Sequence, residues 1–401
     1  MTQEIFSLGD FNLIHSIISG IGYLLPIPLG FLAFFLWTRF KKENFPLDTK
    51  WVLLEILVPR DVIKTPAAME LIFSNTFAPK LWFSLELVSI DGRVHFYIRT
   101  PIRIRDLVET QVYAQYPQAK VVEVEDYAFN IPQFEKKGDW YMWGCEFVKK
   151  KEDFLPIKTH KGFGDDMKTG IKEEYKIDPI TPTIEFLGSL GKGQQMWVQI
   201  LVKQSSKKYY SEAKSKLVDF YDAAQEYMIK LHKPYTKVQK EGSPDIDMKT
   251  PETLKPVIKA INDQLGLNHY DCGIRVVTLS DKRIVSEEQF DNLRRSSRLI
   301  FRQFSLPFSN ELKRVNSTEF EFAWTDPLGV SIVSMKKQLL DFYRMRTFFH
   351  APLFSQLKPE IFVLSEEELS TLYHFPGMVS EAPSFKRIES KIAKPPSNLP
   401  I

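Results

Sequence analysis

One glycine-rich stretch has the residue types of a phosphate-binding loop, Gly188-Ser-Leu-Gly-Lys-Gly193. A Walker A loop reads G-x-x-x-x-G-K-[ST], because its hydroxyl binds magnesium and the following helix binds phosphate at its N-terminus. In this chain Gly193 takes the place of the hydroxyl residue, and the strand-like segment Met196–Val202 follows where a helix is required. We therefore predict a turn that leads into a strand, and no nucleotide-binding site.

The sequence lacks the usual catalytic and metal-binding motifs. It contains no H-E-x-x-H and no G-x-S-x-G, and Cys145 and Cys272 have no partner at C-x-x-C spacing. The carboxylates of Asp165-Asp166 and of Glu366-Glu-Glu368 are adjacent, a pattern that is typical of solvated loops and helix caps. No two histidines share a metal-ligand spacing. The seven histidines are His15, His95, His160, His232, His269, His350 and His374.

These observations predict a non-enzymatic protein that uses no metal and no cofactor. The alternative is an enzyme, for example a membrane-bound hydrolase, whose site is assembled from residues far apart in the sequence. A deep pocket lined by convergent acids or histidines with shifted pKa values would favour the enzyme. A flat surface without such a pocket would favour the non-enzymatic protein.

A basic helix face is the other candidate site. The net charge of the whole chain is only +3, which does not indicate a dedicated nucleic-acid-binding protein. A helix from Ser286 to Phe304 nevertheless places several arginines opposite its apolar side. This face is either a solvated helix surface or a surface for nucleic acid or anionic lipid. Its residues, with the two basic residues before the helix, are Lys282, Arg283, Arg294, Arg295, Arg298 and Arg302.

A long apolar stretch, Leu13–Trp37, predicts a single membrane-spanning helix over residues 13–38. No charged residue occurs between Asp10 and Arg39, and about 20 apolar residues suffice to cross a bilayer. The flanking charges predict an N-terminus (1–12) outside and a soluble body in the cytoplasm, at the inner membrane. A kink is expected near Pro26 and Pro28. The expected membrane-interface residues are Trp37, Arg39, Lys41 and Lys42.

The remaining chain predicts an α+β fold in two domains. Residues 43–127 follow the order β-α-β-β-α-β of a ferredoxin-like domain, with Asp91-Gly92 as a hairpin turn. Residues 128–325 predict a second α+β domain. Its alternation of strands and long helices suggests an elaborated copy of the first domain, although the sequence shows no clear repeat. The second domain includes an extended segment, Pro179–Phe186, and a long helix, Lys207–Leu231. A helical part (326–376) and a Pro- and Lys-rich tail (377–401) follow, and Ser365 with Glu368 predicts a capping box.

Four strings carry a resemblance to a known family. They are Leu54-Glu-Ile-Leu-Val-Pro59, Glu185-Phe-Leu-Gly-Ser-Leu-Gly-Lys-Gly-Gln194, Arg298-Leu-Ile-Phe-Arg-Gln-Phe-Ser305 and Leu369-Ser-Thr-Leu-Tyr-His-Phe-Pro-Gly377. The chain resembles an uncharacterised bacterial family of membrane-anchored proteins. Members of that family look like the N-terminal, non-ATPase region of type IV secretion coupling proteins and related DNA-translocating ATPases.

The resemblance implies a membrane-anchored scaffold subunit of a type IV secretion or conjugation-like system. Such a subunit would face the cytoplasm and dock a separate motor ATPase, because this chain contains no Walker A or Walker B motif. The implied partners are the bilayer, the motor ATPase or another secretion subunit, and nucleic acid if the basic face binds it.

Overall fold

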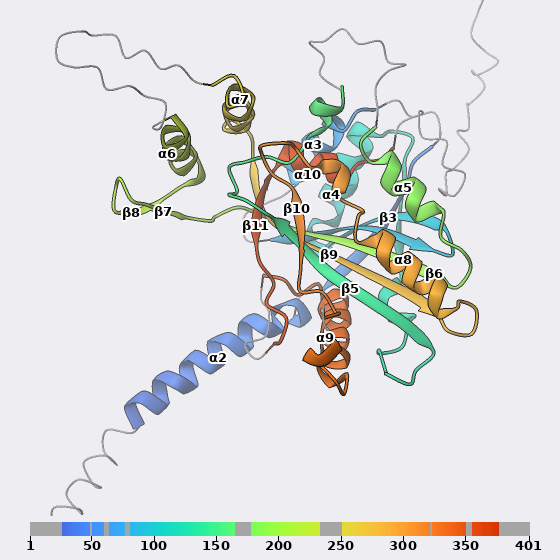
Figure 1. Ribbon diagram of the computed structural model, residues 1–401. Coiled ribbons are helices and arrows are strands. Elements are labelled where there is room, and N and C mark those ends of the chain that lie inside the picture. Colours follow the sequence, from blue (N-terminus) through green and yellow to red (C-terminus); the bar gives the residue numbers. More distant parts are fainter. Residues whose placement is uncertain are drawn as a thin grey trace, which may run out of the picture.

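One antiparallel sheet organises the part of the chain that the structure describes (Figure 1). This computed structural model describes residues 26–48, 50–59, 64–76, 81–164, 178–232, 251–320, 323–349 and 355–376. Within these ranges nine strands form the sheet, and their bounds are β1 (Trp51–Leu57), β2 (Trp82–Ile90), β3 (Arg93–Pro101), β4 (Lys120–Val124), β5 (Trp140–Lys149), β6 (Gln194–Gln204), β9 (His269–Asp281), β10 (Leu312–Val315) and β11 (Phe362–Ser365).

The helices are distributed along the chain between the strands. Their bounds are α2 (Pro26–Asp48), α3 (Ala67–Thr76), α4 (Arg105–Gln115), α5 (Thr181–Gly188), α6 (Phe220–His232), α7 (Lys255–Gln264), α8 (Glu287–Ser297), α9 (Val330–Met345) and α10 (Glu366–Leu372). A small separate hairpin, β7 (Tyr209–Ser211) and β8 (Lys216–Val218), precedes α6.

The order of the strands shows two similar halves in one sheet. The first half runs β4-β1-β3-β2 and the second runs β10-β5-β9-β6, so each half places its strands in the order of a β-α-β-β-α-β unit. The halves join where β2 pairs with β6, from Trp82 opposite Lys203 to Ile90 opposite Gln195. The second half differs by an insertion, β7 to α7, between β6 and β9.

The predicted fold class is wrong, because the structure is a mixed arrangement of helices and one large antiparallel sheet. The strands that were assigned to two domains pair continuously across β2 and β6, so the sheet does not divide at the predicted boundary. A pairing of this kind joins residues more than one hundred positions apart, and local periodicity carries no information about it.

The predicted membrane span and inner-membrane location are also not supported. None of the helices that the structure describes combines the length and the apolar character needed to cross a membrane. In α2 the apolar part extends from Pro26 to Thr38, about 20 Å of helix, and charged residues follow from Arg39 onwards. Residues 13–25 of the predicted span lie outside the described residues, as do the N-terminus (1–12) and the tail (377–401).

Two local predictions in the second half are wrong for identifiable reasons. The predicted extended segment Pro179–Phe186 contains α5, since the proline in its first turn has no backbone N–H to lose and favours a helix start. The predicted long helix Lys207–Leu231 is helical only from Phe220. Ser215 has a φ of 47°, a left-handed conformation that turns β7 into β8 and that no right-handed helix contains.

Several other local predictions are confirmed. The hairpin turn between β2 and β3 has positive φ at both Asp91 and Gly92, as a two-residue turn of this kind requires. Gly193, at φ 79°, is in the predicted turn into β6. The capping box of α10 is present, with the Ser365 hydroxyl and the Glu368 carboxylate each accepting a backbone N–H from the other residue.

Helices cover both faces of the sheet (Figure 1). On one face, apolar residues of α3, α4, α5 and α8 share a core with alternate residues of the strands, including Phe83 and Phe96. On the other face, Leu339 and Leu340 of α9 pack against Trp197 and Val277. The last described segment contributes to both faces, because α9 covers one while α10 packs beside α3 on the other.

Gly144 in β5 allows α9 to lie close to the sheet. A Cβ atom at this position would be 2.4 Å from Leu339 Cδ2 and 2.7 Å from the carbonyl oxygen of Val276. The second of these atoms belongs to the neighbouring strand and cannot move without disturbing the ladder.

Gly144→Ala is therefore expected to lower the free energy of unfolding by about 1–3 kcal/mol, the usual cost of overpacking. Chemical denaturation followed by tryptophan fluorescence measures this change. Gly266→Ala is the matched control, since no heavy atom lies within 4 Å of its added Cβ. An equal loss in both variants would show that α9 does not lie on Gly144 as described.

Candidate functional site

A cavity of about 320 Å³ lies between α7, the loop 156–162, the loop 306–309 and the start of α10. Charged and polar side chains from separate segments meet there. Two other cavities of about 330 and 300 Å³, beside Gly329 and beside Ile258, are lined by fewer residues. The charged residues that line the first cavity are Lys158, Lys161, Lys259, Asp263 and Glu367.

Helical spacing in α7 gives the helix an apolar side, which packs on a small core, and a charged side at the cavity. Val257 and Ile261 are buried in a small core that also contains Phe154 and Leu155. Lys259 and Asp263 are four positions apart and therefore lie on one face of the helix, at the cavity. The insertion thus supplies one wall of the cavity, and the sheet with its loops supplies the other.

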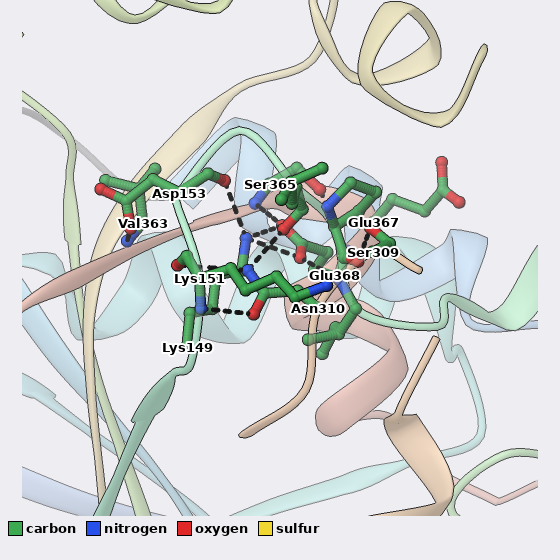
Figure 2. Close-up of polar contacts among 12 residues, drawn as sticks. Lys149, Lys151, Asp153, Ser309, Asn310, Val363, Ser365, Glu367 and Glu368 are labelled. Carbon is green, nitrogen blue, oxygen red and sulfur yellow. Dashed lines mark hydrogen bonds and ion pairs between the residues drawn. The ribbon is translucent and has the colours of Figure 1, made fainter. Parts of the chain in front are cut away.

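A buried ion pair holds the wall formed by α10. Lys149 Nζ lies 2.8 Å from Glu368 Oε1, and each side chain is only 1% exposed. Glu368 also accepts hydrogen bonds from the backbone N–H groups of Ile157 and Ser365, each at 2.9 Å (Figure 2). Burial raises the pKa of Glu368 above its ordinary value, and Lys149 opposes this shift. The pair therefore joins β5, the cavity loop and the first turn of α10.

Neutral hydrogen bonds fix the chain on either side of the loop (Figure 2). The Asn310 side-chain amide donates to the carbonyls of Glu152 and Leu155, and its oxygen accepts from the Lys151 backbone N–H. The Ser309 hydroxyl donates to the Pro156 carbonyl at 2.7 Å. These bonds hold residues 151–156 in one conformation before the loop reaches the cavity.

A second group of titratable side chains lies next to the cavity but does not line it. His160 Nε2 is 3.4 Å from Glu70 Oε1, and His160 is buried. Burial and the nearby Glu367 raise the pKa of Glu70 to about 7. Burial lowers the pKa of His160 to about 4. The ion pair between Lys161 and Glu367 connects this group to the cavity wall.

A third group is a row of buried polar side chains under α9. Glu86, Gln199, Arg275 and Glu146 lie opposite one another on β2, β6, β9 and β5. Arg275 Nη2 binds Glu146 Oε1 at 2.7 Å, and Arg346 Nε binds Glu86 Oε1 at 2.9 Å. Burial alone would raise the pKa of Glu86, but the charge and hydrogen bonds of Arg346 lower it overall. This row is fully enclosed and holds the sheet to α9.

The predicted basic face is largely paired with acids. Arg294 and Arg298 each bind Glu319 at 2.5 Å, and Arg283 binds Asp281 at 2.6 Å. Lys282 donates to the Gly138 carbonyl and lies over the Tyr141 ring. Arg295 and Arg302 are exposed and have no ion-pair partner in the described ranges. Binding of nucleic acid or anionic lipid by this face stays a prediction, and its free charge is reduced to these two arginines.

The predicted membrane-interface residues lie at the far part of α2. Trp37 and Lys41 are exposed, and the side chains of Arg39 and Lys42 lie outside the described residues. With no spanning helix among the described residues, their assignment to a membrane interface loses its basis.

The sequence failed to identify the residues of the cavity. The adjacent acids of α10 were expected to be solvated, which is wrong for Glu367 and Glu368, since both are buried. Asp165 and Asp166 lie outside the described residues. One sequence feature indicated the buried ion pair, the triple lysine Lys149-Lys-Lys151 at the end of a strand. A lysine that directly follows buried strand residues is itself buried in part and then needs an acid partner. In the described ranges, no group of three histidines, cysteines or acids could hold a metal ion.

Comparison with known families identifies a domain family to which no function is assigned. A family model described as a domain of unknown function, DUF8128, matches residues 73–296, which is more than half of the chain. The protein therefore belongs to the DUF8128 family. The matched range includes β2 to β9 and nearly all of α8. A comparison with curated proteins finds no match. Neither comparison connects the chain to type IV secretion, to conjugation or to a scaffold role, so those predicted assignments have no support.

The buried pair of Lys149 and Glu368 predicts a specific pattern of stabilities. Lys149→Met should lower the free energy of unfolding by about 3–5 kcal/mol, because it leaves Glu368 buried without its partner. Lys149→Met with Glu368→Gln should lose less than Lys149→Met alone, since no unpaired charge is then buried. Denaturant unfolding of the three proteins gives these values.

Lys150→Met is the control for this series. Its lysine binds Glu311 at the surface, and such exposed pairs contribute about 0–1 kcal/mol. A loss in Lys150→Met as large as in Lys149→Met would contradict the description of a buried pair.

Proposed function

We propose that this protein is a non-catalytic subunit of a protein assembly, in which copies of the chain associate through α2. The observation that carries the proposal is the exposed apolar surface of this helix. The helix extends away from the sheet (Figure 1). Large apolar side chains along it are 43–73% exposed, and they are Ile27, Leu29, Phe31, Leu32, Phe34, Phe35, Leu36, Trp37 and Phe40.

An exposed apolar surface of this size is expected to bind another apolar surface. Isolated apolar side chains are common on protein surfaces, but a contiguous group of this size marks an interaction site. The apolar side chains occur at consecutive positions and therefore surround the helix on all sides. One neighbouring helix would cover only one side, so several neighbours are needed.

Further copies of the chain are the occupants we propose for this surface. Every copy supplies the same apolar helix, and symmetric association of identical chains is the commonest form of oligomer. Gly30 has no heavy atom within 4 Å of an added Cβ, which leaves room for close approach of another helix. The resemblance to the region that precedes a motor ATPase makes a separate motor ATPase the expected partner of the assembly.

The candidate site favours a non-catalytic role. The acid and the histidine with shifted pKa values beside the cavity, Glu70 and His160, do not line it. Apolar residues and one glycine make up half of the cavity lining, and lysines and neutral polar residues outnumber the two acids among the others.

Replacing Phe31, Phe34 and Phe35 together by serine tests the proposal. Light scattering coupled to size-exclusion chromatography should show an oligomer for the unmodified chain and a monomer for this variant. The temperature of unfolding of the sheet should change little, because these side chains are exposed.

Ile229→Ser is the matched control. Ile229 is 68% exposed on α6, so its replacement should leave the oligomer intact. A monomeric unmodified chain, or an oligomer that persists in the triple variant, would overturn the proposal. Binding of α2 to lipid vesicles without self-association would overturn it as well.

A second candidate function is hydrolysis, and it rests on the pair of Glu70 and His160. A carboxylate with a pKa near 7 can accept a proton from water at neutral pH, which is the requirement for a general base. His160 lies 3.4 Å from it and has a lowered pKa, so the imidazole is neutral at the same pH.

The pKa of Glu70 predicts how stability depends on pH. Because the folded-state pKa is raised from 4.5 to about 7, the folded protein holds a proton there that the unfolded chain releases. Stability should therefore fall as pH rises through this window. Glu70→Gln removes this effect, so its stability relative to the unmodified protein should increase between pH 5 and pH 8 by roughly 1–3 kcal/mol.

Thermal unfolding of both proteins over this pH range measures the difference. His160 contributes in the opposite direction below its unfolded pKa, since its folded-state pKa is lowered, so the comparison is read mainly above pH 6.5, where His160 is mostly neutral in the folded and unfolded states. A difference that does not vary with pH would show that Glu70 does not titrate near neutrality, and hydrolysis would lose its general base.

A further inference from the structure

The cavity beside α7 has more hydrogen-bond donors than the protein itself satisfies. Lys158 and Lys259 line it and have no ion-pair partner in the parts of the chain that are described. Lys158 Nζ lies 3.8 Å from the centre of the Phe163 ring, a contact that holds the cation without neutralising it. The third lysine, Lys161, is paired with Glu367.

Gln264 adds a neutral polar side chain to the cavity. It lines the cavity, and the residue is only 4% exposed. Its side-chain amide has no hydrogen-bond partner within the described ranges. An amide that lines a cavity and has no partner in the protein is free to bond a ligand there. The Thr159 hydroxyl also lines the cavity, likewise without a partner in those ranges.

The charges around the cavity decide the kind of ligand. Three lysines face two carboxylates, and one of these carboxylates, Glu367, is occupied by Lys161. The other, Asp263, lies on the exposed part of α7. The cavity therefore presents two unpaired lysines, one unpaired carboxylate, a free amide and a free hydroxyl, so cations outnumber anions among its unpaired groups and the set suits a single phosphate or carboxylate group.

We infer that this cavity binds a small anionic molecule carrying a phosphate or carboxylate group, through Lys158, Lys259 and Gln264. A volume of about 320 Å³ is at the lower end of the range for ligand sites, so the molecule is small. Its binding joins the insertion, through α7, to the loop that precedes α10. This site is separate from the α2 surface and does not depend on the proposed assembly.

Titration of the full chain with inorganic phosphate and with acetate, at matched ionic strength, tests the inference. Isothermal calorimetry should detect binding of at least one of the two, and the stronger one identifies the group that the cavity prefers. Lys259→Ala and Gln264→Leu should each raise the dissociation constant of that probe roughly tenfold, the effect of losing about 1.4 kcal/mol.

Lys255→Ala is the matched control. Lys255 is an exposed lysine of the same helix, it does not line this cavity, and it pairs with Glu252 at the surface. Its replacement should leave the dissociation constant unchanged. An equal effect in Lys255→Ala and Lys259→Ala would mean that the anion responds to the general charge of α7, and would overturn the site.

Gln264→Leu gives a further readout that does not require a ligand. If its amide is unpaired, leucine should leave the unfolding temperature of the ligand-free protein unchanged or raise it. A lower unfolding temperature would show that Gln264 has a structural partner. That result, or the absence of binding of both phosphate and acetate, would overturn the inference.

Discussion

The rest of the structure depends on the row of buried polar side chains under α9. Glu86, Gln199, Arg275 and Glu146 occupy paired positions on four neighbouring strands, so the row crosses the junction between the two halves of the sheet. Arg346 at the end of α9 binds Glu86 and completes it. Apolar contacts tolerate small shifts, but these charges must meet their partners, since one unpaired member costs about 3–5 kcal/mol. A slip of one strand by one residue would turn its charged member to the apolar face, so the row fixes the register of both halves together.

Local elements were predictable where local chemistry decides them. The turn at Asp91-Gly92 and the capping box at Ser365 follow from the residues themselves, and the structure confirms both. Errors arose where periodicity was the only guide. The apolar residues between Lys207 and Leu231 fit a helical repeat, but a left-handed Ser215 makes a hairpin there first. The continuous pairing of β2 with β6 could not be predicted, because it depends on which strand edges meet after folding. The membrane span was inferred from an uncharged apolar stretch and its flanking charges, and the described helices do not provide it.

The candidate site could hardly be predicted from the sequence. Its cavity combines α7, two loops and α10, and the loop at Ile157 is 211 positions from Glu368 in α10, a distance that no motif spans. The acids of α10 illustrate the difficulty. Three glutamates in a helix cap normally face water, and here the first turn of α10 is covered by β5 and the loop 156–162. Burial of Glu368 therefore depends on Lys149, a residue whose own surroundings are fixed only when the sheet is complete.

The last described strand has a consequence for how the chain reaches this structure. β11 pairs with β9 from Phe362 to Ser365, immediately beyond the point where β5 leaves that strand. Four residues at one end of β9 are thus paired by a strand that lies more than eighty positions later in the chain, and α9 and α10 belong to the same late segment. During synthesis, β11 must leave the ribosome before this edge of β9 is paired to its end. Until then, the unpaired edge of β9 is open to other extended chains, so slow translation through this segment would favour aggregation.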